Sequence, residues 1–155
     1  DANHKEVCRQ ESEEEGSIVK DNYNELLSST FLDENNNKKI ITEEDILVVA
    51  PYNVQVNYLK SILPKNAKVG TIDKFQGQQA SATIISMTTS DPESLPRNID
   101  FFFSRNRLNV AISRSQCLSI VIMNKRILEI SCKKIRHMHL VNTFMKLLEF
   151  ERSPN

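Results

Sequence analysis

Short apolar runs alternate along the chain with segments whose apolar residues recur every three or four positions. The apolar runs predict buried strands, and they cover residues 46–50, 69–72, 82–87 and 118–123. The segments with helical spacing predict helices, and they cover residues 12–31, 54–63, 108–115 and about 125–150. Because strands that alternate with helices are typical of βαβ units, we expect a single α/β domain. Its sheet should be mainly parallel and covered on both faces.

Local signals mark the ends of several elements. Ser12 followed by Glu15 has the spacing of a capping box, which predicts where the first helix begins. The acidic run 13–15 is predicted to be a solvated first turn, which the helix dipole favours. The Asn-rich stretch 33–39 and the proline-containing stretch 90–97 predict loops.

Composition is that of an ordinary globular domain. The 155 residues are 39% hydrophobic and 26% charged. No apolar run approaches the roughly 20 residues that span a bilayer, and no basic region precedes an apolar stretch at the start. The three cysteines are an odd number without a close pair, which argues against a disulfide framework and a zinc site. We therefore expect an intracellular protein with no membrane segment. Because the chain begins at Asp1 rather than Met, we expect a piece of a longer protein.

A formal net charge of zero conceals an asymmetry. Residues 1–50 carry 13 acidic and 5 basic side chains, whereas residues 51–155 carry 7 acidic and 15 basic ones. A basic segment behind an acidic one suits contact with a polyanion through one face. Mutual neutralisation of the two parts is an equally simple interpretation of the charge alone.

Polar side chains that could bind a ligand lie at the ends of the predicted strands. Gly70 and Gly77 both fall in residues 69–79, a predicted strand and the chain after it, where short hydrogen-bonding side chains surround Gly77. The carboxyl ends of parallel strands are where open α/β sheets bind ligands. A strand–turn–helix with a glycine for the turn is the plain alternative. Tyr52 follows another strand and offers an aromatic face for a base, or packs at the start of a helix.

The segment 107–115 precedes the last strand and reads as a helix with a polar face. Asn109 and Ser113 are four residues apart and share that face, and Arg107 and Arg114 nearly align. An arginine that projects from such a helix can reach a phosphate with its planar fork. A surface arginine is the common alternative.

Taken together in chain order, the segments 50–59, 69–79 and 107–115 resemble the second RecA-like domain of superfamily 1B helicases. This is the nonsense-decay and Dna2-type group. Motifs IV, V and VI of that group have the patterns PYN-x-Q, (S/T)-x-D-x-FQG and RLNVA-x-(S/T)-R. The matches are Pro51-Tyr52-Asn53-x-Gln55, Thr71-x-Asp73-x-Phe75-Gln76-Gly77 and Arg107-Leu108-Asn109-Val110-Ala111-Ile112-Ser113-Arg114. The resemblance covers about residues 46–124. It implies a three-layer αβα RecA-like domain, with residues 125–155 as a helical tail.

The resemblance also implies an ATP site shared with a partner lobe. Arg114 matches the arginine finger of motif VI, which stabilises charge on the transferring phosphoryl group. The other residues that match nucleotide-contacting positions are Tyr52, Gln55, Gly77 and Gln79. The residues assigned to single-stranded DNA or RNA are Asn53, Thr71 and Asp73, because a hydroxyl and backbone amides suit contact with phosphates.

Two departures and one absence qualify these implied roles. Gln79 stands where the family usually has Glu, and Val56 stands where some members have a second Arg. The chain has no G-x-x-x-x-G-K-[ST] segment and no apolar strand that ends in Asp-Glu. We therefore expect ATP and Mg²⁺ to be held by an amino-terminal RecA-like lobe of the same parent protein, and this chain to be inactive alone.

The sequence thus predicts the carboxy-terminal motor lobe of an ATP-dependent helicase. A non-catalytic RecA-like scaffold or binding module is the alternative that the two departures favour. A small-molecule enzyme on a Rossmann-like sheet is disfavoured, because the chain has no G-x-G-x-x-G and no nucleophile–base pair.

Overall fold

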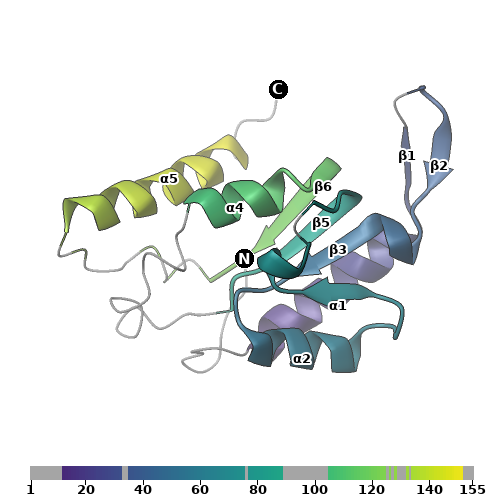
Figure 1. The fold of residues 1–155 in the computed structure, drawn as a ribbon, viewed down its shortest axis with the longest axis horizontal. Coiled ribbons are helices and arrows are strands. Elements are labelled where there is room, and N and C mark those ends of the chain that lie inside the picture. The colour runs from purple at the N-terminus through teal and green to yellow at the C-terminus, as the bar shows by residue number, and fades with distance from the viewer. Residues whose placement is uncertain are drawn as a thin grey trace.

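The computed structural model describes residues 12–32, 35–75, 77–88, 105–124 and 134–151, together with the single positions 126, 128 and 132. Its elements follow one another as strands and helices (Figure 1). The helices are α1 (Glu13–Leu27), α2 (Asn53–Ile62), α4 (Arg105–Ile112) and α5 (Ile135–Glu151). The strands are β1 (Thr30–Leu32), β2 (Lys38–Ile40), β3 (Ile46–Val49), β4 (Lys68–Gly70), β5 (Ala80–Ser86) and β6 (Ser115–Ile122). Short 3₁₀ turns lie at Glu43–Asp45 (η1) and Ile72–Phe75 (η2).

Four strands form one parallel sheet in the order β4-β3-β5-β6. The chain leaves β3 toward β4 and then returns past β3 to β5, so the direction of winding reverses between β3 and β5. Val49 pairs with Gly70 on one side and with Ile85 on the other. The predicted α/β fold with a parallel sheet is confirmed, and its three layers are those of a RecA-like domain.

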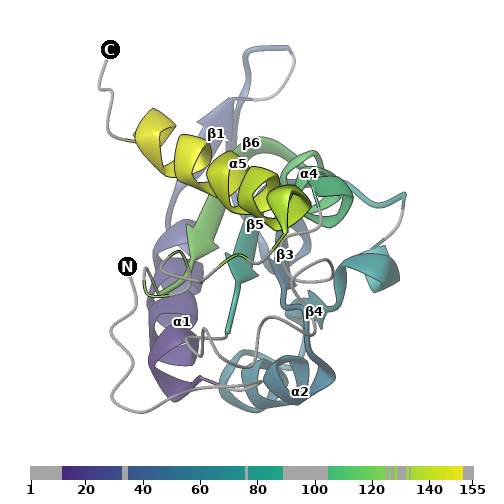
Figure 2. The ribbon, with the colours of Figure 1, turned by 90° about the vertical axis from the view of Figure 1, so that its left-hand side faces the viewer.

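Helices cover both faces of this sheet, as Figure 2 shows. In β3, Ile46 and Val48 face a core that is formed with α1 and α2, whereas Leu47 and Val49 face a second core formed with η2, α4 and α5. This alternation follows from the period of two along a strand. A strand that is buried on both faces must be apolar at every position, which is why residues 46–50 form a continuous apolar run.

The first helix is shorter than the spacing predicted. It ends at Leu27, where the hydroxyls of Ser28 and Ser29 donate to the Glu25 carbonyl at 2.8 and 2.9 Å. Hydroxyls that bond the last carbonyls compete with continuation of the helix. The predicted helix includes Phe31, but this residue lies in β1 and pairs antiparallel with Lys39 in β2. The predicted loop 33–39 is thus partly a hairpin strand.

The remaining predictions concern the carboxy-terminal helix, the loop 90–97 and the number of domains. The helix predicted from about residue 125 begins only at Ile135 and runs to Glu151. Its residues Leu140 and Val141 join the core next to α4. The predicted loop 90–97 lies outside the described residues. The assignment of the whole chain to a single domain stays a prediction. Among the described helices, none combines the length and the apolar character needed to cross a bilayer.

Candidate nucleotide and nucleic-acid interface

Four of the predicted site residues follow the carboxyl ends of β3 and β4. These two ends are adjacent, because the backbone N–H of Ala50 donates to the Gly70 carbonyl at 3.2 Å. Tyr52 precedes α2 and packs half-buried against the core, and this burial raises the pKa of its phenol. Asn53 is the exposed first residue of α2. Thr71 and the exposed Asp73 follow β4, so the structure brings the predicted nucleic-acid contacts to one edge of the sheet.

The fifth residue at this end, Gln55, points inward. Its side chain is fully buried in the first turn of α2. Its Oε1 accepts from the Ser12 backbone N–H at 2.9 Å, and its Nε2 donates to the Ser12 carbonyl and to Ser86 Oγ, both at 3.2 Å. Buried amides require such partners, since an unsatisfied one costs about 1–3 kcal/mol. Gln55 therefore joins α2 to the chain before α1 and to β5, and an ATP contact by this residue stays a prediction.

β4 ends and β5 begins at opposite ends of the sheet. Gly70 lies level with Ile85 through the register of β3, whereas β5 begins five residues earlier at Ala80. At about 3.3 Å per residue, that difference is roughly 16 Å along the strand. A Cβ on Gly70 would lie 2.6 Å from Lys74 Cδ and 3.2 Å from the Phe75 ring, so a larger residue would force both side chains to shift. Gly77 has a φ of +81°, a conformation that favours glycine.

Arg114 and Gln79 meet at the amino ends of β6 and β5. The backbone N–H of Ala80 donates to the Arg114 carbonyl at 2.9 Å, and Gln116 Nε2 donates to Gln79 Oε1 at 3.5 Å. Gln79 is exposed, whereas Arg114 is half-buried. Arg114 Nε is buried and has no hydrogen-bond partner among the described residues. A buried donor of this kind is costly unless water or a ligand supplies an acceptor.

The predicted ATP-binding residues therefore do not gather at one end of the sheet. Gln79 and Arg114 lie at the amino ends of β5 and β6, whereas Tyr52 and Gln55 lie beyond the carboxyl end of β3. Gly77 lies in the connection between β4 and β5, three residues before β5 begins. The sequence windows gave residue types and their order but carried no information about this separation.

A buried polar cluster, which the sequence did not predict, lies where the winding of the sheet reverses. Glu15 is fully buried, and its Oε2 accepts from Ser86 Oγ at 2.6 Å and from the Thr88 backbone N–H at 2.8 Å. Thr88 has a φ of +73°, which is unusual for a β-branched residue. The prediction of a solvated run 13–15 is thus wrong at Glu15. Of the predicted capping box, the bond from the Glu15 backbone N–H to Ser12 Oγ is observed at 3.1 Å.

This cluster bears on where a ligand can bind. Doubly wound sheets bind ligands outside the carboxyl ends of the strands at the reversal point. Here the Glu15 carboxylate and the Gln55 amide both bond Ser86 Oγ, at the carboxyl end of β5. A negatively charged phosphate is disfavoured beside a buried carboxylate. Among the residues that the structure describes, no group of three or more His, Cys, Asp or Glu side chains is placed to hold a metal ion.

Comparison with known proteins gives consistent matches. Residues 2–126 match the model of a family described as an AAA domain. The chain is 30% identical over 127 residues to the DNA polymerase alpha-associated DNA helicase A of Saccharomyces cerevisiae, which covers 77% of this chain and 18% of that protein. It is 31% identical over 101 residues to the probable RNA helicase armi of Drosophila melanogaster, covering 58% of this chain and 8% of that protein.

A third relative is an uncharacterized ATP-dependent helicase of Methanocaldococcus jannaschii. It is 34% identical over 85 residues, which cover 53% of this chain and 12% of that protein. The chain thus spans less than a fifth of the length of each of these relatives. Because the aligned share is small, the matches bear on the domain rather than on the whole proteins.

Proposed function

Because this chain belongs to the AAA-domain family and is a superfamily 1B helicase-like domain, we propose that it is the carboxy-terminal motor lobe of an ATP-dependent helicase. Three relatives of this chain are named as a DNA helicase, an RNA helicase and an ATP-dependent helicase. The parallel RecA-like sheet is compatible with such a lobe. The polymer acted on is single-stranded DNA or RNA.

One observation carries the proposal. Arg114 holds a buried guanidinium nitrogen that has no partner among the described residues. In a two-lobed motor, this guanidinium would face the γ-phosphate of ATP bound to the other lobe. It would stabilise the negative charge that grows on the equatorial oxygens during phosphoryl transfer. Because Arg114 Nε is buried, the side chain would have to turn outward as the lobes close before the phosphate could serve as its acceptor.

The other residues take roles that follow from their places. Gln79 lies beside Arg114 and is proposed to contact the nucleotide with its amide, with Gly77 shaping the approach of the backbone. Tyr52 and Gln55 are proposed to act from the far end of β3, Tyr52 through its ring and Gln55 by fixing α2. We propose that the bound single strand of DNA or RNA runs past Thr71, Asp73 and Asn53.

The parent protein is proposed to supply what this chain lacks. An amino-terminal RecA-like lobe would hold the ATP phosphates and Mg²⁺, so the chain alone would not hydrolyse ATP. Alternate closing and opening of the two lobes would then shift the grip on the nucleic-acid backbone. We also propose that the protein is intracellular.

The test uses the intact parent protein with Arg114→Ala and Arg114→Lys. We expect Arg114→Ala to lower nucleic-acid-stimulated ATP turnover by about 10³-fold or more, as for other arginine fingers. Binding of a single strand should stay within a few-fold of the unaltered protein. Arg114→Lys should recover only part of the activity, because an ammonium does not reproduce the planar fork.

The exposed Arg126 provides a matched control, because Arg126→Ala removes the same charge away from this edge. Turnover in Arg126→Ala should equal that of the unaltered protein. If Arg114→Ala keeps full turnover, Arg114 is not the arginine finger. Parallel assays with DNA and RNA would identify the polymer.

A non-catalytic scaffold is the second candidate. Gln79 bonds Gln116 and has an amide where the helicase family usually has the carboxylate of Glu. Val56 is buried in the core and provides no second positive charge. If the parent protein carries no Walker A and B strands and does not hydrolyse ATP, the scaffold is favoured over the motor.

A further inference from the structure

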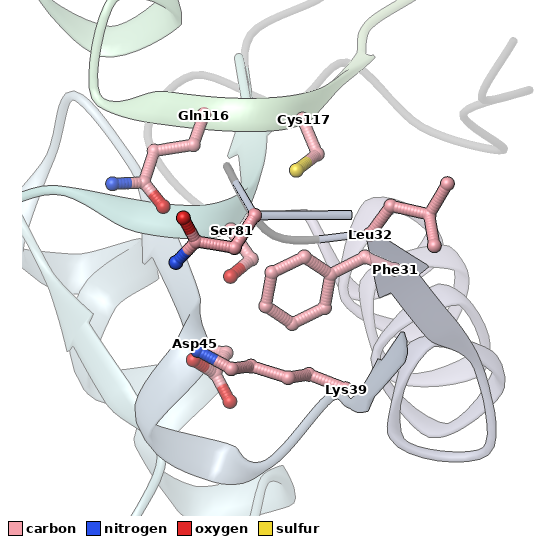
Figure 3. A pocket seen from close by; sticks show the side chains of 8 residues that line it. Phe31, Leu32, Lys39, Asp45, Ser81, Gln116 and Cys117 are labelled. Atoms are coloured by element: carbon pink, nitrogen blue, oxygen red, sulfur yellow. The ribbon is translucent and has the colours of Figure 1, made fainter. Parts of the chain in front are cut away.

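A cavity of about 500 Å³ opens between the β1–β2 hairpin and the main sheet. One wall consists of Phe31 and Lys39 from the hairpin, and the opposite wall consists of Gln116 and Cys117 at the start of β6 (Figure 3). Ser81, near the start of β5, is only 3% exposed and lines the cavity between these walls. None of these residues belongs to the three motifs.

The lining combines one aromatic ring with groups that form hydrogen bonds. Figure 3 shows the Phe31 ring projecting into the cavity between Lys39 and Cys117, and Asp45 also lines the cavity. Phe31 is held from behind, because it also packs against the core formed by α1 and α2. A ring that is anchored in this way presents a stacking face at low cost in entropy.

The size and chemistry of the cavity suit a planar heterocycle. Ligand cavities are usually about 300–1,000 Å³ in volume and combine apolar walls with a few polar groups. Here a ring offers a face for stacking, and amide, hydroxyl and carboxylate groups surround it. Nucleobases are recognised by this combination of an aromatic platform and hydrogen bonds to the base edge.

The cavity adjoins the edge that carries Arg114. Gln116 lines the cavity, and its Nε2 donates to Gln79 Oε1 at 3.5 Å. Ala80 and Ser115, which follow Gln79 and Arg114, are paired neighbours in the sheet. A ligand in the cavity would therefore lie beside the residues that we propose to contact ATP.

We infer that this cavity binds a nucleobase, with the Phe31 ring stacked on one face of the base and Gln116 at its edge. The inference rests on the proposed function, because a helicase lobe meets bases in ATP and in the single strand. Stacking on an aromatic ring is common to both sources, and the experiment distinguishes them.

The experiment compares Phe31→Leu and Gln116→Ala in the intact parent protein. Leucine keeps an apolar contact with the core but removes the ring, and Phe31→Tyr restores a ring. Ile40→Ala is the control, because Ile40 lies in the same hairpin, is 68% exposed and does not line the cavity. Thermal unfolding of each variant shows whether the fold is kept.

Four probes separate the sources of the base. ATP is compared with ribose 5′-triphosphate, which has no base, and an oligothymidylate is compared with the same strand containing abasic sites. We expect Phe31→Leu to weaken the binding of one base-carrying probe by about 5- to 150-fold, the range for loss of aromatic stacking. Its baseless counterpart should bind unchanged. Phe31→Tyr should retain binding, and Gln116→Ala should weaken it in the same probe.

The probe that weakens identifies the source as the nucleotide or the strand. Equal binding of all four probes by Phe31→Leu and the unaltered protein would overturn the inference, as would equal weakening of a base-carrying probe and its baseless counterpart. Either result leaves the Arg114 test unaffected. Unchanged turnover in Arg114→Ala, by contrast, would remove the motor role without deciding whether a base binds in the cavity.

Discussion

Loss of the Glu15 carboxylate should loosen the carboxyl end of β5. Glu15 Oε2 accepts from Ser86 Oγ at 2.6 Å and from the Thr88 N–H at 2.8 Å inside the protein. Hydrogen bonds to a charged group contribute about 1.5–3 kcal/mol each, or about 3–6 kcal/mol for the pair. Relaxation of the left-handed Thr88 backbone returns about 1–3 kcal/mol of strain. Taken at the middle of both ranges, the net cost of Glu15→Ala should be about 2.5 kcal/mol.

Amide hydrogen exchange measures this effect where it arises. A loss of about 2.5 kcal/mol corresponds to about 70-fold faster exchange of the Thr88 amide, if the cluster opens locally. Glu15→Gln keeps an oxygen acceptor without the charge. It should lose about half as much, because charge-assisted bonds are about twice as strong as neutral ones. Exchange is followed by mass spectrometry on peptides that cover residues 80–88 of the intact protein.

Glu25→Ala is the control, because Glu25 lies on the same helix but is exposed. It should leave exchange in β5 unchanged. The reasoning is refuted if the Thr88 amide exchanges at one rate in the unaltered protein, in Glu15→Gln and in Glu15→Ala. Faster exchange over the whole chain in Glu15→Ala would show global destabilisation instead of a local clamp.

Two further predictions concern single groups. Burial, and then the Glu43 carboxylate, raises the pKa of Tyr23 to about 12. Because the folded pKa lies above the ordinary value of about 10, the free energy of unfolding should be unaffected below pH 10 and should fall between about pH 10 and 12. Tyr23→Phe, which removes a hydroxyl without a partner among the described residues, should abolish that part of the fall in thermal unfolding measured against pH; an identical fall in the variant would contradict the assignment. Gly77→Ala should cost about 1–2 kcal/mol, because φ is +81° while the space around a Cβ is open. Gly77→Asn should cost less in the same unfolding assay, and equal losses would show that backbone conformation is not the cause.

Local pattern was sufficient for the layered architecture. Residues 46–50 are apolar at every position because β3 is buried on both faces, and this is visible in the sequence without any partner strand. Likewise, Val56 and Leu59 share a buried face of α2 because a helix repeats every 3.6 residues. Periodicity depends on near neighbours only, so it survives in a single sequence.

Local pattern misled where a local signal had two outcomes. Ser12 and Glu15 have the spacing of a capping box, and the Ser12 hydroxyl does accept from the Glu15 backbone N–H. The Glu15 carboxylate, however, accepts from residues more than 70 positions away, Ser86 and Thr88. No feature within the first turn distinguishes a carboxylate that faces solvent from one that faces the end of a distant strand.

The sequence by itself determined the alternation of elements, the motif residues and their order along the chain. Only the tertiary structure decided that Arg114 and Gln79 meet at one end of the sheet while Tyr52 and Thr71 lie at the other. It also decided that the hairpin encloses a cavity with the start of β6. The physical reason is that hydrophobic periodicity records which face of an element is buried. The register between strands and the path of each connection depend on contacts between residues far apart in the chain.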